Sequence, residues 1–256
     1  GNIIYVSGFR DSNPLLQLSG LAVHATPRLV PGTDTLDPNN GFTKQALGAS
    51  AGSQILSGKI PYWNHYGGVG APLLGEMQSA AMFPLTLLIT LTNGVLLFNI
   101  TLETIAGFFT YLFLRKLKID WWAAVIAGAM FALNGTFAWL TNAVFNPIAF
   151  MPMMFYGIER ILQKSEKSKV PSWIYFSLAI SLSLYSGFPE TAFIDALLAC
   201  VWVIVRLAMI NEKKAVVVNI KKVARGSVIG IGLSAPVLVA FLTYLPDANI
   251  GGHDGA

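Results

Sequence analysis

The chain has 256 residues, of which 54% are apolar and only 12% are charged. Water-soluble domains carry about twice that share of charge, and one soluble core of this size could not bury so much apolar surface. The net charge of +4 comes from basic residues between apolar blocks, so it does not indicate a nucleic-acid partner. The composition favours an integral membrane protein over a soluble enzyme.

Residues 1–93 form the polar part of the chain. The first 35 residues are rich in Gly, Pro, Ser and Thr without a clear period, so we expect mostly loop. Asp37-Pro38 has the sequence of a helix start, with Asp as N-cap and Pro at the first helical position. We expect a helix over Phe42–Ser57 that ends at Gly58. The next loop, Lys59–Pro72, is rich in aromatic residues and glycine, which suits the membrane interface or stacking on a sugar ring.

The following apolar blocks are about 20 residues long, the length that a helix needs to cross the ~30 Å hydrocarbon layer. Met82–Leu91 is too short to cross, so we expect an interfacial or re-entrant helix there. The pattern predicts an all-α, polytopic membrane protein with an outer segment (1–93), a bundle of about six spans (94–245) and an outer tail (246–256). The expected spans are Gly94–Leu114, Trp121–Leu140, Phe145–Leu162, Ser172–Gly187, Thr191–Met209 and Gly226–Leu245.

The basic residues predict which side of the membrane each connecting loop faces. Thirteen of the 17 Lys and Arg residues lie in every second loop between the expected spans, and the loops between these carry none. Basic residues collect on the cytoplasmic side, so residues 1–93 should lie outside a bacterial plasma (inner) membrane. We also expect a fragment of a longer protein, because no initiating Met or signal precedes the outer segment. The thirteen residues are Arg115, Lys116, Lys118, Arg160, Lys164, Lys167, Lys169, Arg206, Lys213, Lys214, Lys221, Lys222 and Arg225.

Several short motifs occur in a recognisable order in the outer segment. An Asp is followed about 25 residues later by a G-x-x-P-x-W-N motif, then by G-x-G-x-P and Q-S-A-x-x-F-P, and a G-x-P-E turn occurs in the second half. This order resembles the GT-C glycosyltransferases, most closely the bacterial YfhO-like membrane proteins, over about residues 34–206. The matching residues are Asp37, Gly58, Pro61, Trp63, Asn64, Gly68, Gly70, Pro72, Gln78, Ser79, Ala80, Phe83, Pro84, Gly187, Pro189 and Glu190.

The resemblance implies an enzyme that takes a sugar from a polyprenyl-phosphate donor on the outer face and passes it to a glycan, lipid or protein acceptor. Asp37, or Asp34 three residues earlier, would take the proton of the acceptor hydroxyl. Lys59, Lys44 or Arg28 would stabilise the leaving phosphate. No cofactor is implied with certainty, and a divalent metal ion is left open. The residues expected to bind substrate are Trp63, Asn64, Tyr66, Lys59, Glu76, Gln78 and Glu190.

The same residues also have structural interpretations. Asp37 is an equally good N-cap, and Trp63 with its neighbouring tyrosines is typical of a membrane-interface belt. The three histidines have no metal-ligand spacing, so we expect no metal ligand among them. Both interpretations of Asp37 and of the aromatic residues stay open at this point.

Glu103 and Asp195 each lie inside an expected span. A lone charge at mid-bilayer costs roughly 2.5–3.5 kcal/mol or more, so Glu103 should face the bundle, be protonated or pair with a polar group. Asp195 shares a helix face with Thr191, one turn earlier. Glu190 is either a helix-dipole partner or the floor of an outward-facing polar pocket. These acids would form the polar path of a transporter or flippase, the rival function; a non-catalytic membrane subunit is the third.

Overall fold

The computed structural model describes residues 41–66, 69–91, 94–135, 143–163 and 170–248. These residues are mostly helical, which confirms the all-α prediction. The strands among them are β1 (Trp63–Asn64) and β2 (Ala71–Pro72), which form one short antiparallel pair. The predictions for Asp34, Arg28 and the helix start at Asp37-Pro38 lie outside the described residues.

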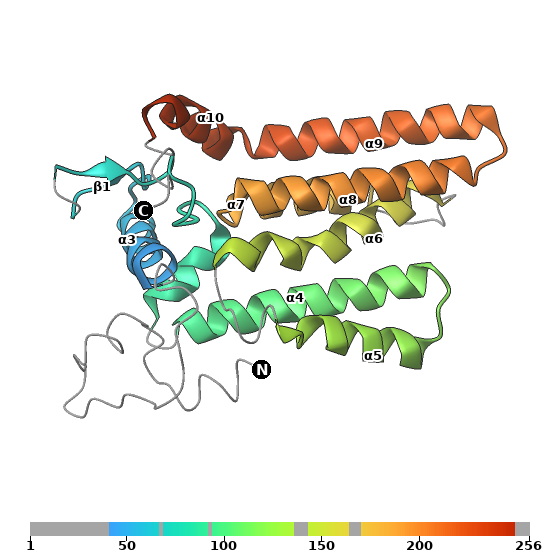
Figure 1. The fold of residues 1–256 in the computed structure, drawn as a ribbon, viewed down its shortest axis with the longest axis horizontal. Coiled ribbons are helices and arrows are strands. Elements are labelled where there is room, and N and C mark those ends of the chain that lie inside the picture. Colours follow the sequence, from blue (N-terminus) through green and yellow to red (C-terminus); the bar gives the residue numbers. More distant parts are fainter. Residues whose placement is uncertain (1–40, 67–68, 92–93, 136–142, 164–169, 249–256) are drawn as a thin grey trace, which may run out of the picture.

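The helices α4 to α9 lie side by side and alternate in direction along the long axis of the molecule (Figure 1). The first five expected spans overlap α4 to α8. The third of them begins as a 3-10 helix, η4 (Ala143–Phe150), because Pro147 cannot donate an α-helical hydrogen bond. The bounds are α4 (Gly94–Lys116), α5 (Trp121–Ala132), α6 (Met151–Leu162), α7 (Ile174–Tyr185), α8 (Pro189–Ala208) and α9 (Lys213–Leu233).

Two of the described helices, α4 and α8, are long and apolar enough to cross a membrane on their own. A third span results if α9 and α10 (Ala235–Tyr244) count together. The helices α5 and α7 are apolar but have only 12 residues each. The described part of the chain therefore has two or three candidate spans, and the predicted number of about six is not confirmed.

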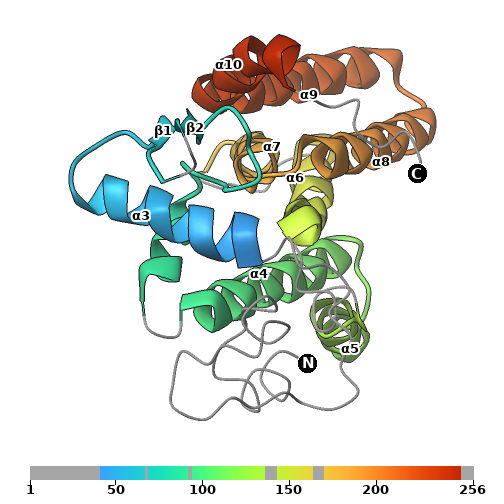
Figure 2. The same cartoon turned by 60° about the vertical axis from the view of Figure 1, so that its left-hand side comes forward.

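The last expected span, Gly226–Leu245, is not one straight helix. The helix α9 begins earlier, at Lys213, and the chain bends by 64° between α9 and α10. Pro236 lies in the first turn of α10, where a missing N–H is tolerated, but it cannot continue the hydrogen bonding of α9. As a result α10 lies next to the β1–β2 pair at one end of the bundle (Figures 1 and 2).

The segment before α4 covers this same end of the bundle (Figure 2). It contains the π-helix η1 (Gly41–Leu47), the helix α3 (Gly48–Leu56) and the 3-10 helix η2 (Pro84–Thr90). We call residues 41–91 the end segment. Gly58 follows α3 with φ of +73°, so the predicted glycine stop is confirmed. The short helix predicted over Met82–Leu91 is η2, which packs against both α3 and α4.

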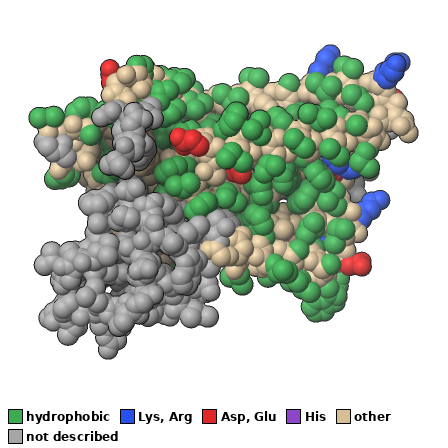
Figure 3. Space-filling model, in the orientation of Figure 1, with side chains coloured by type: hydrophobic (Ala, Val, Ile, Leu, Met, Phe, Trp, Pro, Cys, Tyr) green, Lys and Arg blue, Asp and Glu red, His purple; other side chains and the backbone are tan. Residues whose placement is uncertain are grey.

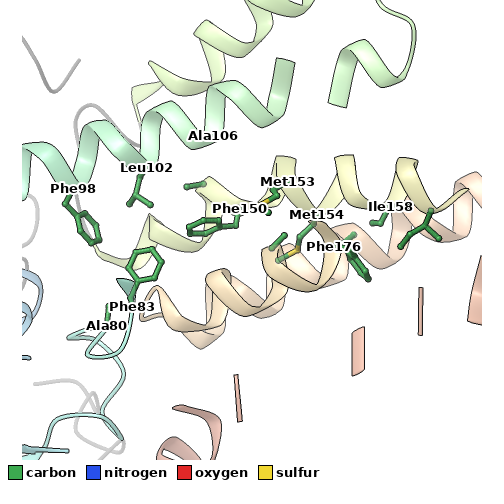
Figure 4. Close-up of a cluster of buried hydrophobic side chains, with 14 of the residues drawn as sticks. Ala80, Phe83, Phe98, Leu102, Ala106, Phe150, Met153, Met154, Ile158 and Phe176 are labelled. Carbon is green, nitrogen blue, oxygen red and sulfur yellow. The ribbon is translucent and has the colours of Figure 1, made fainter. Parts of the chain in front are cut away.

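Phe83 joins the end segment to the helix bundle. Its side chain is fully buried and meets the rings of Phe98 on α4 and Phe150 on η4 edge to face, with 5.8 Å between centroids in both pairs. Each such pair adds about 0.5–1.5 kcal/mol to the free energy gained by burial. The apolar core continues from these rings along α4, α6 and α7 (Figure 4).

A buried ion pair joins α6 to α8 near the opposite end of the bundle. Glu159 is fully buried, and its Oε1 accepts hydrogen bonds from Nε of Arg206 at 2.7 Å and Nε1 of Trp202 at 2.9 Å. Its Oε2 accepts from Nη2 of Arg206 and Nε2 of Gln163, both at 2.9 Å. Both carboxylate oxygens are therefore satisfied, which is the condition for a buried charge to be tolerated.

Removal of Arg206 should destabilise the protein more than removal of Glu159. Arg206→Met leaves a fully buried carboxylate without its cation, and breaking such a pair costs about 3–5 kcal/mol. Glu159→Gln leaves an arginine side chain that is 25% exposed and can be hydrated, so about 1–2 kcal/mol should be lost. Thermal unfolding of the purified protein measures both losses.

The double variant Glu159→Gln/Arg206→Met is the matched control for this prediction. It should recover part of the stability lost in Arg206→Met, because no unpaired charge is left inside the bundle. Equal losses in the two single variants, together with simple additivity in the double variant, would contradict a stabilising ion pair between α6 and α8.

Candidate functional site

The loop around Trp63 is a small hairpin on the end segment. Trp63 pairs with Pro72 and Asn64 pairs with Ala71. Gly70 has φ of +97°, and a Cβ atom at this position would lie 2.0 Å from Nε1 of Trp63. The indole thus packs directly on glycine backbone, where no side chain fits. Trp63 is still 41% exposed, so part of its ring is accessible to a ligand.

The other predicted residues of the hairpin also lie on its surface. Lys59 and Tyr66 are exposed, and Tyr66 reaches 88% exposure. Asn64 is half-buried, and its Oδ1 accepts a hydrogen bond from the Tyr66 N–H at 3.0 Å. This is an Asx turn, so part of the hydrogen-bonding capacity of Asn64 shapes the loop. The hairpin offers ring faces and one cation.

The turn after the hairpin packs against the connection between α7 and α8. A Cβ atom on Gly187 would lie 3.0 Å from the Met77 carbonyl oxygen and 3.3 Å from the Cβ of Ala80. Gly187 itself has φ of +111°, a backbone conformation that glycine adopts without strain. The structure therefore brings together two motifs that are more than one hundred residues apart in the sequence.

Three predicted substrate-binding residues lie in or near this contact. Glu76 is half-buried, and its Oε1 accepts a hydrogen bond from the Ser79 N–H at 2.8 Å. Burial raises the pKa of Glu76, and hydrogen bonds from Ser79 and Gln78 partly oppose that rise. Gln78 and Glu190 are exposed, and Glu190 lies in the first turn of α8, where its charge suits the helix dipole.

A group of buried polar side chains lies on η4, α7 and α8 beside the Gly187 turn; we call it the α7–α8 polar cluster. Nδ2 of Asn146 donates to the Ser186 carbonyl at 3.1 Å, and Oγ of Ser186 donates to the Ser183 carbonyl at 2.7 Å. Asp195 is only 2% exposed and Thr191 is 8% exposed, as expected from their shared helix face. The members of the cluster are Asn146, Ser183, Ser186, Thr191 and Asp195.

A second polar group joins the end segment to α4. Lys44 is only 3% exposed, and its ammonium donates to Oδ1 of Asn99 and lies 4.6 Å from the centre of the Phe98 ring. Burial lowers the pKa of Lys44 to about 7, and the carboxylate of Glu103 opposes this shift. Lys44 was a candidate for stabilising a leaving phosphate, but its ammonium is buried against α4 instead of lying beside the exposed hairpin.

Glu103 is 6% exposed, which confirms that it faces the bundle. It also lies on the wall of a hollow of about 250 Å³ between α4 and α5. Gly107 and Gly128 allow the two helices to approach closely, since a Cβ atom on Gly128 would lie 2.7 Å from the Gly107 carbonyl oxygen. The other lining residues are Thr104, Tyr111, Val125, Ala129 and Ala132.

No group of three or more His, Cys, Asp and Glu side chains that could hold a metal ion occurs within the described ranges. Sequence reasoning missed two of the groups described above. Glu159 carries no motif, and its pairing with Arg206 requires knowing how α6 packs on α8. The burial of Lys44 beside Glu103 likewise depends on how the end segment docks.

No known protein family, characterised protein or solved structure matches this chain.

The buried Lys44 should make stability depend on pH. Its pKa is about 7 in the folded protein and 10.5 when unperturbed, so between these values the unfolded chain binds more protons. Folding stability should then rise with pH across this window, by at most about 1.4 kcal/mol per pH unit. Lys44→Met should lack this rise. Unfolding of wild type and variant at pH 7, 8 and 9 measures the difference.

The matched control is Lys59→Met, which removes an exposed lysine from the same end segment. Its unfolding should follow the wild-type profile at each pH. A stability difference between wild type and Lys44→Met that stays constant over the whole window would contradict the inferred deprotonation of a buried lysine.

Proposed function

We propose that this chain belongs to an integral membrane protein and that its helix bundle lies in the bilayer. The strongest support is the surface of α8, where seven large apolar side chains are each between 47% and 66% exposed. Soluble monomers rarely expose apolar patches of this kind (Figure 3). In hydrocarbon the same surface is favourable. The seven residues are Phe193, Ile194, Leu197, Leu198, Val201, Ile204 and Val205.

The two ends of the bundle differ in charge, which supports an orientation with the basic end on the cytoplasmic side. Arg115 and Lys116 end α4, Arg206 lies in the last turn of α8, and α9 begins at Lys213. On the face shown in Figure 3, Lys and Arg side chains lie at the end opposite α10 and the β1–β2 hairpin. The basic end would face the cytoplasm and the end segment would lie outside.

The orientation can be tested with single cysteines in a Cys200→Ser background. Ser57 lies on the exposed side of the end segment and Lys213 is exposed at the basic end. In intact cells Ser57→Cys should react with an impermeant thiol reagent, whereas Lys213→Cys should react only after the cells are opened. The reverse labelling pattern would place the end segment in the cytoplasm and would rule out an outer site.

We further propose that the outer end carries a GT-C-type glycosyltransferase site. The observation that carries this proposal is the packing of the Met77–Ala80 turn on Gly187, which brings together two of the motifs on which the resemblance rests. The half-exposed ring of Trp63 would stack on a sugar or prenyl group, and Lys59 supplies a cation on the same hairpin. The substrate would be a polyprenyl-phosphate sugar, which reaches this end from the bilayer.

In this reaction the acceptor hydroxyl oxygen forms a bond to the anomeric carbon while the bond from that carbon to the phosphate oxygen breaks. Asp37 or Asp34 would take the hydroxyl proton, and the electron pair leaves with the lipid phosphate, which is stabilised by nearby cations. The products are the glycosylated acceptor and the polyprenyl phosphate. A general base contributes on the order of 10²–10⁴-fold to such a rate.

Two isosteric variants separate the base from a helix cap. If Asp37 is the base, Asp37→Asn should keep stability, because Asn caps helices about as well as Asp, and should lower transfer on the order of 10²-fold or more. Transfer of a radiolabelled sugar from polyprenyl phosphate by the purified full-length protein is the measurement.

Asp34→Asn is the internal control, since the two acids are three residues apart. Loss of transfer in Asp34→Asn but not in Asp37→Asn would assign the base to Asp34. Full activity in both variants of an otherwise active protein would contradict an outer-segment base.

A transporter or flippase is the second candidate, and one observation favours it. Glu103 lies on the wall of the hollow between α4 and α5, and α5 is short for a simple span. Movement of a solute or lipid in proteoliposomes, without consumption of a lipid-linked sugar, would favour this function over sugar transfer.

A further inference from the structure

The side chain of Asp195 is buried with a carboxylate oxygen that has no hydrogen-bond partner in the described part of the chain, and neither the ion pair of the bundle nor the proposed transferase site accounts for this. It lies in the second turn of α8, on the buried face that it shares with Ala192 and Ala199. Its side chain is 2% exposed, and Oδ2 has no hydrogen-bond partner among the described residues. The Oγ of Ser183, a fully buried residue of α7, also has no partner there. The α7–α8 polar cluster thus contains two buried oxygen atoms that no donor satisfies.

Counted along the two helices, Ser183 and Asp195 lie about one turn apart in depth. Ser183 and Thr191 are each four residues from Gly187, so they lie at a similar depth on either side of the α7–α8 turn. Asp195 is one turn deeper on α8. The carbonyl of Ser186 already accepts the amide of Asn146, which holds η4 against this turn. The cluster is therefore rich in hydroxyl and carboxylate oxygen atoms.

On the described elements that pack most extensively against α8, the charged side chains lie away from Asp195 or are paired with other groups. Among the described elements, those that pack most extensively against α8 are η4, α6 and α7. The sequence of η4 contains no ionisable residue, and α6 carries Glu159 and Arg160 in its last turns. Tyr175, near the start of α7, lies against Arg160, and Tyr185, at the end of α7, donates to the Leu233 carbonyl.

The charged residues of α8 itself do not balance Asp195 either. Arg206 lies 11 residues along the helix, roughly 16 Å away, and is held by Glu159. Glu190 is exposed and carries the same sign of charge as Asp195.

A carboxylate in this position is expensive unless it is neutralised. Burying an isolated charged group in a medium of low dielectric constant costs far more than burying a neutral one, so such a group takes up a proton or a cation instead. Carboxylate and hydroxyl oxygens are hard ligands that suit cations such as Na⁺. Glu159 shows the contrast, since four hydrogen-bond contacts stabilise its charge.

We propose that Asp195 is the binding site of one small monovalent cation, a proton or Na⁺, within the α7–α8 polar cluster. The hydroxyl groups of Ser183 and Thr191 supply further oxygen ligands when the cation is Na⁺. This site is separate from the sugar-transfer chemistry, since it depends only on the burial of Asp195 and on the lack of a balancing charge on the described elements that pack most extensively against α8.

Infrared spectroscopy of the purified full chain in lipid nanodiscs tests the site without any transfer assay. In Na⁺-free choline buffer near neutral pH, the wild-type protein should show the carbonyl stretch of a protonated carboxylic acid. Asp195→Asn should lose the intensity of one carboxyl group per chain, and Asp195→Glu should retain the band at a shifted frequency. Glu190→Gln, which changes an exposed acid of the same helix, should keep it unchanged.

The two cations give different results in the same experiment. If the site takes Na⁺, added NaCl should abolish the band at constant ionic strength, and Ser183→Ala should weaken this effect. If the site takes only a proton, NaCl should leave the band unchanged and raising the pH should remove it. Identical spectra of wild type and Asp195→Asn in choline buffer from mildly acidic to mildly alkaline pH, with no response to NaCl, would overturn the proposal.

Discussion

A helix that is surrounded by hydrocarbon has to turn its polar side chains toward other parts of the protein, because lipid offers no hydrogen bonds. The acids that lie inside α4, α6 and α8 obey this constraint. Glu103, Glu159 and Asp195 are all less than 10% exposed, whereas the apolar side chains of α8 point outward. The three acids are thus buried within an otherwise apolar bundle interior, next to the core that runs along α4, α6 and α7.

The three buried acids meet the constraint in three different ways. Glu159 is paired with Arg206 and fully hydrogen-bonded, which makes it a structural link between α6 and α8. Glu103 lies near Lys44, a lysine that the end segment brings to α4. Asp195 has no such partner on the elements packed against it, and for this reason it is the acid to which we assign a ligand.

The end segment is important because it ties the surface hairpin to the bundle. Phe83 fills the space between Phe98 and Phe150, and Lys44 contacts Asn99 one turn away from Glu103. These two contacts fix a loop-rich segment whose own secondary structure is short. A rigid support of this kind is what a binding surface on a loop requires. The exposed Trp63 hairpin is thus held in a defined position above the helices.

Sequence reasoning predicted the local features and missed those that depend on packing. The apolar lengths placed α4 and α8 within a few residues, and Gly58 ended α3 as expected, because both signals are local. The helix expected over Gly226–Leu245 begins earlier, at Lys213, and is bent, because hydrophobicity alone does not indicate the bend that precedes Pro236. The pairing of Glu159 with Arg206, 47 residues away, could not be predicted from either neighbourhood. The catalytic roles of Asp34 and Asp37 stay predictions.

The central claim is that the apolar surface of α8 faces lipid, and the lone cysteine allows a direct test. Cys200 lies in the middle of α8 and is exposed, so a spin label can be attached without any mutation. In nanodiscs, the label should collide often with molecular oxygen, which concentrates in the hydrocarbon, and rarely with a water-soluble nickel complex. A label at Cys200 that collides freely with the nickel complex would show that α8 faces water and would contradict the account.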